Sequence, residues 1–287
     1  MIQINKYLTG IKPYQISKSA DLSFQQKQQY LKLDWNETTI PPSPKVIQSL
    51  MDILKTGGLY FYPDVNATEL SLAIAEYVKL NQNNVLVYNG SDDALNNIFI
   101  AFLNPNDKVL FRDPTYSQIE TFIISRGAKI ERFLGHTAIT FDPEKYCEYL
   151  DRQIINIVYI ANPNNPTGVM YDKSFIDYLC RCYPKTLFVV DEAYYEFAQV
   201  TVVELIKKYS NLIVTRTFSK AFGLAGLRIG YILADPCLLN ILKLIRNGKD
   251  VNLLAQIAAK SALDDLPYMQ SYVNEVIDTR NWLFNEI

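Results

Sequence analysis

The sequence is almost without histidine. His136 is the only one among 287 residues, which excludes a zinc site or any other metal site built from several histidines. A Ser-His-Asp triad would have to use that one residue. The four cysteines (Cys147, Cys180, Cys182 and Cys237) form no C-x-x-C pair, which favours inert thiols in a reducing compartment over redox or metal use. Catalysis would therefore rest on Lys, Asp, Tyr and Arg side chains or on an organic cofactor.

Excess charge and long apolar runs are missing as well. The formal net charge is −2, so charge gives no case for nucleic-acid binding. No apolar run approaches the roughly 20 residues that cross a bilayer, and the N-terminus lacks the apolar core of a secretory signal. Hydrophobic residues make up 49% and charged residues 20%, as in ordinary globular proteins. We expect a soluble, cytoplasmic protein that binds neither nucleic acid nor membrane.

Apolar runs typical of strands alternate with helix-length segments through the middle of the chain. The runs that predict strands are Val85–Tyr88, Lys108–Phe111, Ala128–Phe133, Ile155–Ile160, Leu187–Val190, Leu212–Thr215 and Ile229–Leu233. Helical segments between them include about Asp92–Leu103, Ser174–Cys182 and Thr201–Lys208. This alternation predicts an α/β fold with a mostly parallel sheet covered by helices on both faces. The last two strands are too close together for a crossover helix, so we expect an antiparallel strand there.

The two ends of the chain differ from this central block. Residues 1–45 are polar and punctuated by proline, and an amphipathic helical pattern runs from about Pro267 to Ile287 without a stop signal. We therefore expect an N-terminal arm with part of a small domain (1–40), a large domain (41–245), and interdomain helices with the start of the small domain (246–287). We expect this smaller domain to be incomplete at the C-terminus.

The most informative segment runs from Thr217 to Arg228 and contains Lys220 just after a predicted buried strand. A lysine amine becomes nucleophilic when its charged form is disfavoured, and it can then form a Schiff base with an aldehyde. Thr217 and Ser219 supply hydroxyls, and Arg228 supplies a cation for a phosphate. On its own, the segment is more typical of a surface lysine in a loop.

A carboxylate follows another predicted buried strand. Asp191 should lie at the carboxyl end of that strand, where open α/β sheets bind ligands. A buried carboxylate needs a cationic partner, which a protonated pyridine nitrogen would supply. Tyr194 would then donate a hydrogen bond to a phenolic oxygen on the same ring. The alternative is an aspartate that caps a helix.

Asn89-Gly90-Ser91-Asp92-Asp93 is a turn from a strand into a helix. Free N–H groups at a helix N-terminus suit a phosphate, but the carboxylates of Asp92 and Asp93 would repel one. A phosphate would have to bind the backbone N–H groups and Ser91, with both carboxylates turned aside. The alternative is a plain helix cap.

Two turns fixed by proline follow further strands. Asp113–Tyr116 would place an aromatic ring for stacking, and Ala161–Gly168 would hold an asparagine at the sheet edge, although each could be only a turn. Together, the five segments supply an amine, an acid, a stacking ring, a phenol, an amide and a phosphate cradle. Those are the groups that pyridoxal phosphate (PLP) requires.

These residues resemble fold-type I aminotransferases of the class I/II group, and within it the histidinol-phosphate aminotransferase-like branch. The resemblance runs from about Pro13 to Leu263, through Pro13–Gln15, Asn36-Glu37, Tyr62–Asp64, Asn89–Asp92, Asn162–Gly168, Asp191–Tyr194 and Arg216–Tyr231. It implies the fold-type I PLP-dependent transferase fold and PLP as the cofactor. It also implies a homodimer in which Tyr62 completes the site of the neighbouring subunit.

The resemblance further implies roles for single residues. Lys220 would form the Schiff base with PLP and later act as a proton shuttle, and Asp191 would keep the pyridine nitrogen protonated. Tyr194 and Asn165 would contact the phenolic oxygen, and Tyr116 would stack on the ring. The phosphate would be held by Ser91, the backbone of Asp92 and Asp93, Thr217, Ser219 and Arg228. Tyr14 and Asn36 match positions near the substrate, and no metal is implied.

By this resemblance the protein would be a PLP-dependent aminotransferase acting on an amino acid or a phosphorylated amine and a 2-oxo acid, with histidinol phosphate the leading candidate. One alternative is a decarboxylase of the phospho-threonine decarboxylase type, and another is a truncated PLP-binding protein without full catalysis. The family binds the substrate α-carboxylate with an arginine of the C-terminal small domain. This chain ends at Ile287, before that segment, so we expect a truncated chain or a protein without the usual carboxylate clamp.

Overall fold

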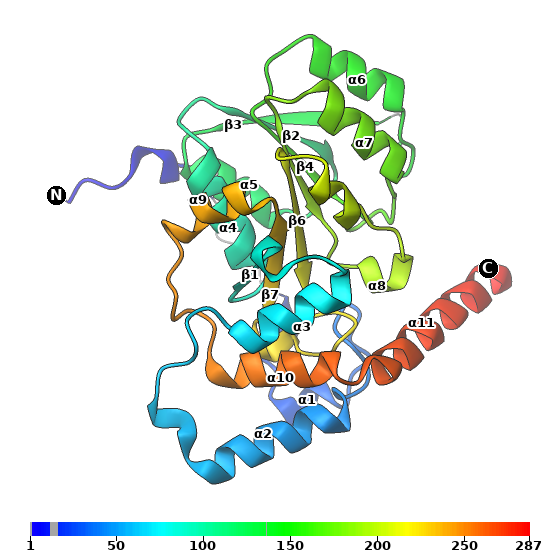
Figure 1. The fold of residues 1–287 in the computed structure, drawn as a ribbon. Coiled ribbons are helices and arrows are strands. Elements are labelled where there is room, and N and C mark those ends of the chain that lie inside the picture. Colours follow the sequence, from blue (N-terminus) through cyan, green and yellow to red (C-terminus); the bar gives the residue numbers. More distant parts are fainter. Residues whose placement is uncertain (1, 12–16, 136) are drawn as a thin grey trace.

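The centre of the molecule is a seven-stranded sheet with the strand order β1-β7-β6-β5-β4-β2-β3 (Figure 1). The computed structural model describes residues 2–11, 17–135 and 137–287. The strands are β1 (Val85–Tyr88), β2 (Lys108–Asp113), β3 (Lys129–Leu134), β4 (Ile157–Ala161), β5 (Leu187–Asp191), β6 (Leu212–Thr217) and β7 (Gly230–Ala234). All the predicted strands are confirmed, with each boundary within two residues of the prediction.

Strand direction decides where the ends of these strands meet. The pairs from β6 through β5, β4 and β2 to β3 are parallel, whereas β7 is antiparallel to both β6 and β1. Six strands therefore end at one edge of the sheet, and β7 begins at that same edge because it runs the other way. The predicted antiparallel strand is confirmed, and a Thr217–Gly230 pair joins β6 to β7 at this edge.

Helices cover both faces of the sheet, as the sequence predicted (Figure 1). Side chains alternate along each strand, so Val158 and Ile160 pack toward α3, α6, α7 and α10, whereas Ile157 and Tyr159 pack toward α4, α5 and α9. The described α-helices are α1 (Phe24–Lys27), α2 (Pro44–Thr56), α3 (Thr68–Val78), α4 (Ser91–Phe102), α5 (Gln118–Ser125), α6 (Pro143–Asp151), α7 (Lys173–Cys182), α8 (Tyr195–Ala198), α9 (Pro236–Lys243), α10 (Leu253–Leu263) and α11 (Leu266–Glu286).

Helix α4 is placed by its sequence so that its N-terminus faces the sheet edge. Gly90 precedes the helix with a φ of 89°, a backbone conformation that glycine adopts without steric cost. Ala94, Leu95 and Ile98 recur at helical spacing and are fully buried against the sheet. Burial of this face fixes the direction of the helix axis, so the free N–H groups of its first turn point toward the strand ends.

One predicted helix is wrong. Thr201–Lys208 contains only a 3₁₀ helix, at Val203–Lys207. The buried carboxylate of Glu192 accepts hydrogen bonds from the Val202 backbone N–H (2.7 Å) and the Thr201 hydroxyl (2.8 Å). These contacts draw the start of the segment toward β5, and its β-branched residues are poor helix formers. The predicted final helix is confirmed as α11, and no helix among the described residues is long and apolar enough to cross a membrane.

Candidate active site

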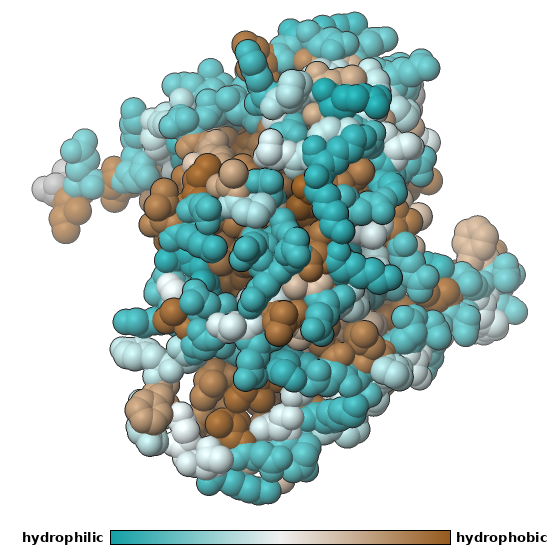
Figure 2. Space-filling view, viewed as in Figure 1, coloured by the Kyte–Doolittle hydropathy of each residue, from teal (hydrophilic) through white to brown (hydrophobic). Residues whose placement is uncertain are grey.

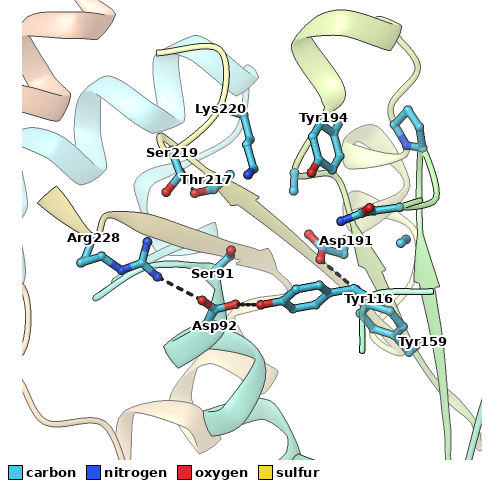
Figure 3. Close-up of a pocket in the computed structure, with 14 residues that line it drawn as sticks. Ser91, Asp92, Tyr116, Tyr159, Asp191, Tyr194, Thr217, Ser219, Lys220 and Arg228 are labelled. Atoms are coloured by element: carbon cyan, nitrogen blue, oxygen red, sulfur yellow. Dashed lines mark hydrogen bonds and ion pairs between the residues drawn. The ribbon is translucent and has the colours of Figure 1, made fainter. Parts of the chain in front are cut away.

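A pocket lies at the edge where the six strands end (Figure 3). It contains all the residues predicted to contact the cofactor except Asp93 and Tyr62. Its lining comprises Ser91, Asp92, Tyr116, Tyr159, Ala161, Pro163, Asn165, Asp191, Ala193, Tyr194, Thr217, Ser219, Lys220 and Arg228. Segments far apart in the sequence meet here because parallel strands bring their carboxyl ends to one edge. Arg228 joins them because it lies two residues before the start of the reversed strand β7.

Lys220 lies in the connection between β6 and β7, and its side chain extends into the pocket rather than into solvent (Figure 3). Its Nζ donates a hydrogen bond to the backbone carbonyl of Trp35 (2.7 Å) and lies 5.6 Å from the centre of the Tyr194 ring. Burial lowers the pKa of Lys220, although the carboxylate of Glu37 opposes this effect. A lower pKa increases the share of neutral amine, which is the form that attacks an aldehyde.

Asp191 ends strand β5 and is buried at the base of the pocket. The Tyr159 hydroxyl donates to its Oδ2 (2.9 Å), and the Thr215 hydroxyl donates to its Oδ1 (3.0 Å). Burial raises the pKa of Asp191 to about 6, and the two hydrogen bonds counteract part of this effect. Asp191 does not cap a helix, because α8 begins four residues later, after Tyr194 in the N-cap position. A positively charged ring nitrogen would suit this carboxylate.

Tyr159 and Thr215 are site residues that the sequence analysis missed. Both lie inside apolar strands, where their alternation is that of ordinary core residues. The available signal was their place in the parallel sheet: Thr215 and Ala161 are paired with Asp191, and Tyr159 lies two residues before Ala161. All four side chains therefore share one face of the sheet.

Asn36 lies beside Tyr194, and its Nδ2 donates a hydrogen bond to the Tyr194 hydroxyl (2.9 Å). Burial raises the pKa of Tyr194, so the phenol stays protonated at neutral pH and can donate a hydrogen bond. Asn36 also lines the cavity that adjoins the pocket. Its position near the substrate, which the resemblance implies, stays a prediction. Tyr14, the other residue predicted there, lies outside the described residues.

Only one of the asparagines in the turn after β4 lines the pocket. Asn165 does so, as predicted. Asn162 exchanges two hydrogen bonds with the backbone of Tyr171, and Asn164 donates to the Pro114 carbonyl (2.9 Å). These two side chains hold the turn in shape, which leaves the Asn165 amide to face the cavity.

The prediction that both aspartates of α4 turn away from the pocket is right for Asp93 and wrong for Asp92. Asp93 accepts a hydrogen bond from Asn97 Nδ2 (2.9 Å) and does not line this pocket, and burial raises its pKa. Asp92 instead accepts hydrogen bonds from Arg228 Nη2 (3.0 Å) and the Tyr116 hydroxyl (2.8 Å) (Figure 3). Two donors inside the pocket, one of them charged, hold this carboxylate there.

The start of α4 packs directly on the start of β7. A Cβ on Gly230 would lie 2.5 Å from the backbone nitrogen of Ser91 and 2.8 Å from the carbonyl carbon of Gly90. Only glycine allows this approach, which brings the first N–H groups of α4 close to the β6–β7 connection. Gly230 is thus a third residue of the site, after Tyr159 and Thr215, that the sequence motifs did not single out.

The donors at this end of the pocket fit a phosphate group. Ser219 Oγ is buried and has no hydrogen-bond partner among the described residues, so it is left to bind a ligand. The Thr217 hydroxyl accepts from the Ser219 backbone N–H (3.1 Å) and thereby shapes the loop. Arg228 supplies a guanidinium, and α4 supplies N–H groups at the positive end of a helix dipole. Several donors of this kind match the acceptor oxygens of a phosphate monoester.

Tyr62 is not part of the pocket in a single chain. It is 78% exposed, and its ring lies 4.5 Å from Lys249 Nζ.

The fold and the pocket define a class of protein. A partly buried amine, a buried carboxylate and a phosphate cradle at the edge of a mostly parallel sheet are the features of a PLP-dependent transferase. The family model "Aminotransferase class I and II" matches residues 28–287, and the chain belongs to this family. The protein is a PLP-dependent aminotransferase, similar to histidinol-phosphate aminotransferases.

Individual relatives agree with this assignment. A dihydroxyacetone phosphate transaminase from Campylobacter jejuni is 40% identical over 276 residues, which cover 96% of this chain and 75% of the relative. A histidinol-phosphate aminotransferase from Geotalea daltonii is 38% identical over 259 residues, covering 90% of this chain and 72% of the relative. The solved histidinol-phosphate aminotransferase from Sinorhizobium meliloti, in complex with pyridoxal 5′-phosphate, matches with a TM-score of 0.80 at 27% identity, covering 86% of this chain and 67% of that one.

Proposed function

We propose that the protein transfers an amino group between a small phosphorylated amine and a 2-oxo acid. The observation that carries the PLP-dependent transfer is the convergence of Lys220 and Asp191 on one pocket whose far end is a cradle for the cofactor phosphate. The choice of a phosphorylated amine as donor rests on the relatives. The relatives named above act, by their names, on histidinol phosphate and on dihydroxyacetone phosphate, and both compounds carry a phosphate monoester. Histidinol phosphate and the amino form of dihydroxyacetone phosphate are therefore the two candidate donors.

Each pocket residue has one task in this proposal. Bound PLP supplies an electron-withdrawing ring that stabilises negative charge on a neighbouring carbon. Lys220 Nζ would hold the aldehyde of the cofactor and, once released by the donor amine, would carry a proton between two carbons on one face of the ring. Asp191 would hold a proton on the ring nitrogen, and Tyr194 and Asn165 would donate to the phenolic oxygen. Tyr116 would lie against the ring.

The phosphate end of the pocket would orient the cofactor. Ser91, Ser219 and Thr217 would offer hydroxyls, and the backbone N–H groups of Asp92 and Asp93 would complete the cradle. Arg228 would pair with the phosphate while Asp92 holds its guanidinium across the pocket. An anchored phosphate would hold the ring in a fixed place relative to Lys220 and Asp191.

A single-turnover assay tests the substrate class. Protein loaded with PLP is mixed with histidinol phosphate, the amino form of dihydroxyacetone phosphate, or their unphosphorylated counterparts, and pyridoxamine phosphate is measured by chromatography. We expect conversion with a phosphorylated donor only. Conversion of the unphosphorylated counterparts alone would contradict the proposed substrate class. Carbon dioxide released from phospho-threonine without pyridoxamine phosphate would favour a decarboxylase.

Lys220→Ala tests the role of the amine. We expect this variant to lose at least about a hundredfold in rate, because proton transfer by a positioned side chain contributes that much or more. It should also lose covalent attachment of PLP, which borohydride reduction followed by mass spectrometry detects. Lys173→Ala is the matched control, since Lys173 forms an ion pair with Glu204 on the surface, away from the pocket. Covalent PLP on Lys220→Ala would contradict the site assignment.

We also propose a homodimer in which Tyr62 reaches the phosphate of the neighbouring site. Its support is the exposed aromatic segment formed by Tyr60 (78%), Phe61 (68%) and Tyr62 (78%), next to the exposed apolar side chains of Met51 and Leu54 on α2. Figure 2 shows apolar side chains gathered in the region of α2 and the segment that follows it. An exposed apolar patch of this kind marks an interaction surface.

Complementation between two inactive variants tests the shared site. Lys220→Ala and Tyr62→Ala are purified separately, mixed, and allowed to exchange subunits. A mixed dimer has one site with both Lys220 and Tyr62, so we expect roughly a quarter of the wild-type activity to return if exchange is complete. The control is a mixture of Lys220→Ala with Asp191→Asn. Both residues belong to the pocket of their own chain, so each subunit of the mixed dimer has a defective pocket and no intact site forms. A mixture of Lys220→Ala and Tyr62→Ala that stays inactive after proven exchange would contradict the shared site.

A further inference from the structure

Asp191 is held by hydroxyl groups from the two strands that flank its own. Tyr159 on β4 donates to Oδ2 (2.9 Å; Figure 3), and Thr215 on β6 donates to Oδ1 (3.0 Å). Tyr159 is 1% exposed and Thr215 is 0% exposed. The two donors reach different oxygens from opposite sides, so together they select one rotation of the carboxylate about its Cβ–Cγ bond. Asp191 still lines the pocket, which leaves its remaining acceptor capacity for a ligand.

The same two hydrogen bonds act on the charge of Asp191. Removal from water favours the neutral acid, whereas a donor that bonds to the ionised form favours the charge. Asp92, in the first turn of α4, further disfavours ionisation, and the Ala193 backbone N–H favours it. The other ionisable side chains that line the same pocket are Tyr116, after β2, Tyr194, after β5, and Lys220 and Arg228, between β6 and β7. Tyr159 and Thr215 are thus the donors from neighbouring strands that favour the ionised form of Asp191 and oppose the effect of burial.

We propose that Tyr159 and Thr215 are positioning residues for the cofactor ring. They keep Asp191 ionised and in one orientation, so that its carboxylate meets a protonated ring nitrogen. Neither residue needs to contact that nitrogen. The inference rests on the role proposed above for Asp191, and it adds that this role depends on donors within the sheet.

Tyr159→Phe removes one donor and keeps the ring that fills the core. Its matched control is Tyr146→Phe, because Tyr146 is also fully buried but its hydroxyl has no hydrogen-bond partner among the described residues. Tyr146 also lies in the core cluster on the other face of the sheet. A general effect of deleting a buried hydroxyl would appear in both variants, whereas an effect through Asp191 would appear only in Tyr159→Phe.

Pyridoxamine phosphate is the probe, since it has the ring nitrogen and the phosphate but no aldehyde, and its binding does not depend on Lys220. Its dissociation constant is measured by equilibrium titration between pH 5 and pH 8. We expect Tyr159→Phe to bind about tenfold more weakly, which is the usual effect of one lost hydrogen bond to a charged group. The pH below which affinity falls should rise by about one pH unit, because Asp191 then takes up its proton more readily. Thr215→Val should act in the same direction.

An analogue with a C–H group in place of the ring nitrogen completes the test. We expect Tyr159→Phe and the wild type to bind this analogue equally, because it offers Asp191 no proton to share. Equal losses of affinity for both ligands would overturn the inference, since the hydroxyl would then act on the shape of the pocket. An unchanged affinity and pH profile for pyridoxamine phosphate in Tyr159→Phe would overturn it as well.

The same measurements separate this inference from the proposed function. If the Tyr159→Phe effects occur as expected but the wild type converts no phosphorylated donor, the proposed substrate class fails and the inference is supported. If the wild type transaminates normally and Tyr159→Phe behaves like Tyr146→Phe, the inference fails and the proposed function is supported.

Discussion

The ionised carboxylate at the base of the pocket should weaken the fold of the cofactor-free protein. Burial raises the pKa of Asp191 from 3.8 to about 6, so the folded state resists ionising a group that ionises freely in the unfolded chain. A pKa difference of one corresponds to 1.36 kcal/mol, which makes the penalty roughly 3 kcal/mol at pH 8. Asp191→Asn keeps the shape of the side chain and removes its charge, and the Tyr159 and Thr215 hydroxyls can each donate or accept. We expect the free energy of unfolding of this variant to be about 1–3 kcal/mol higher than that of the wild type at pH 8.

The difference in unfolding free energy between Asp191→Asn and the wild type should depend on pH in a defined direction. A raised pKa gives stability that is present below pH 3.8 and is lost as the pH rises through about 6. The advantage of Asp191→Asn should therefore be constant above about pH 7, shrink between pH 6 and pH 4, and vanish below that. Urea unfolding of cofactor-free protein, followed by circular dichroism at several pH values, measures it. Asp172→Asn, a change at an exposed aspartate, is the control. An advantage that is absent at pH 8, or that grows toward pH 4, would refute the reasoning.

Three further changes probe the structure around the pocket. Arg216→Met leaves the buried Glu192 carboxylate without its guanidinium partner (Nη2–Oε2 2.8 Å), and denaturant titration should show a loss of about 3–5 kcal/mol in unfolding free energy. Glu196→Gln removes a carboxyl group, and burial raises the pKa of that group to about 7. The same titration should show an unfolding free energy that is higher by up to roughly 3 kcal/mol at pH 8 and unchanged near pH 4. Gly230→Ala forces the start of α4 away from β7, and isothermal calorimetry should show at least about tenfold weaker binding of pyridoxamine phosphate; wild-type affinity in this variant would contradict the phosphate cradle.

The parts of the site that could be predicted are those that follow strands. Asp191 ends β5, Lys220 lies three residues after the end of β6, and Asn165 lies four residues after the end of β4. Parallel strands bring such positions to one edge whatever the helices between them do. The chemistry of each side chain then limits the ligand that the edge can hold. Periodicity and residue type are both local properties, so a single sequence contains them.

The parts that could not be predicted depend on contacts between distant segments. Trp35 offers its carbonyl to Lys220 across 185 residues, and nothing in either segment indicates this pairing. Tyr159 has the alternation of a core residue, and its hydrogen bond to Asp191 follows only from the strand order. The orientation of the Asp92 side chain depends on both the helix dipole and the nearby Arg228. Which of the two decides it follows only from the distances in the folded chain.

The connection between β6 and β7 suggests a way to engineer the enzyme. It leaves the sheet and returns at the same edge, closed by the Thr217–Gly230 pair and by a hydrogen bond from the Phe218 N–H to the Ile229 carbonyl (3.0 Å). The spacing between Lys220 and Arg228 is therefore set within one hairpin, although Phe222 of this hairpin also packs on Tyr77 of α3. We expect residues 217–230 to be exchangeable as one segment with that of another family member, so that the amine and the guanidinium are transferred together.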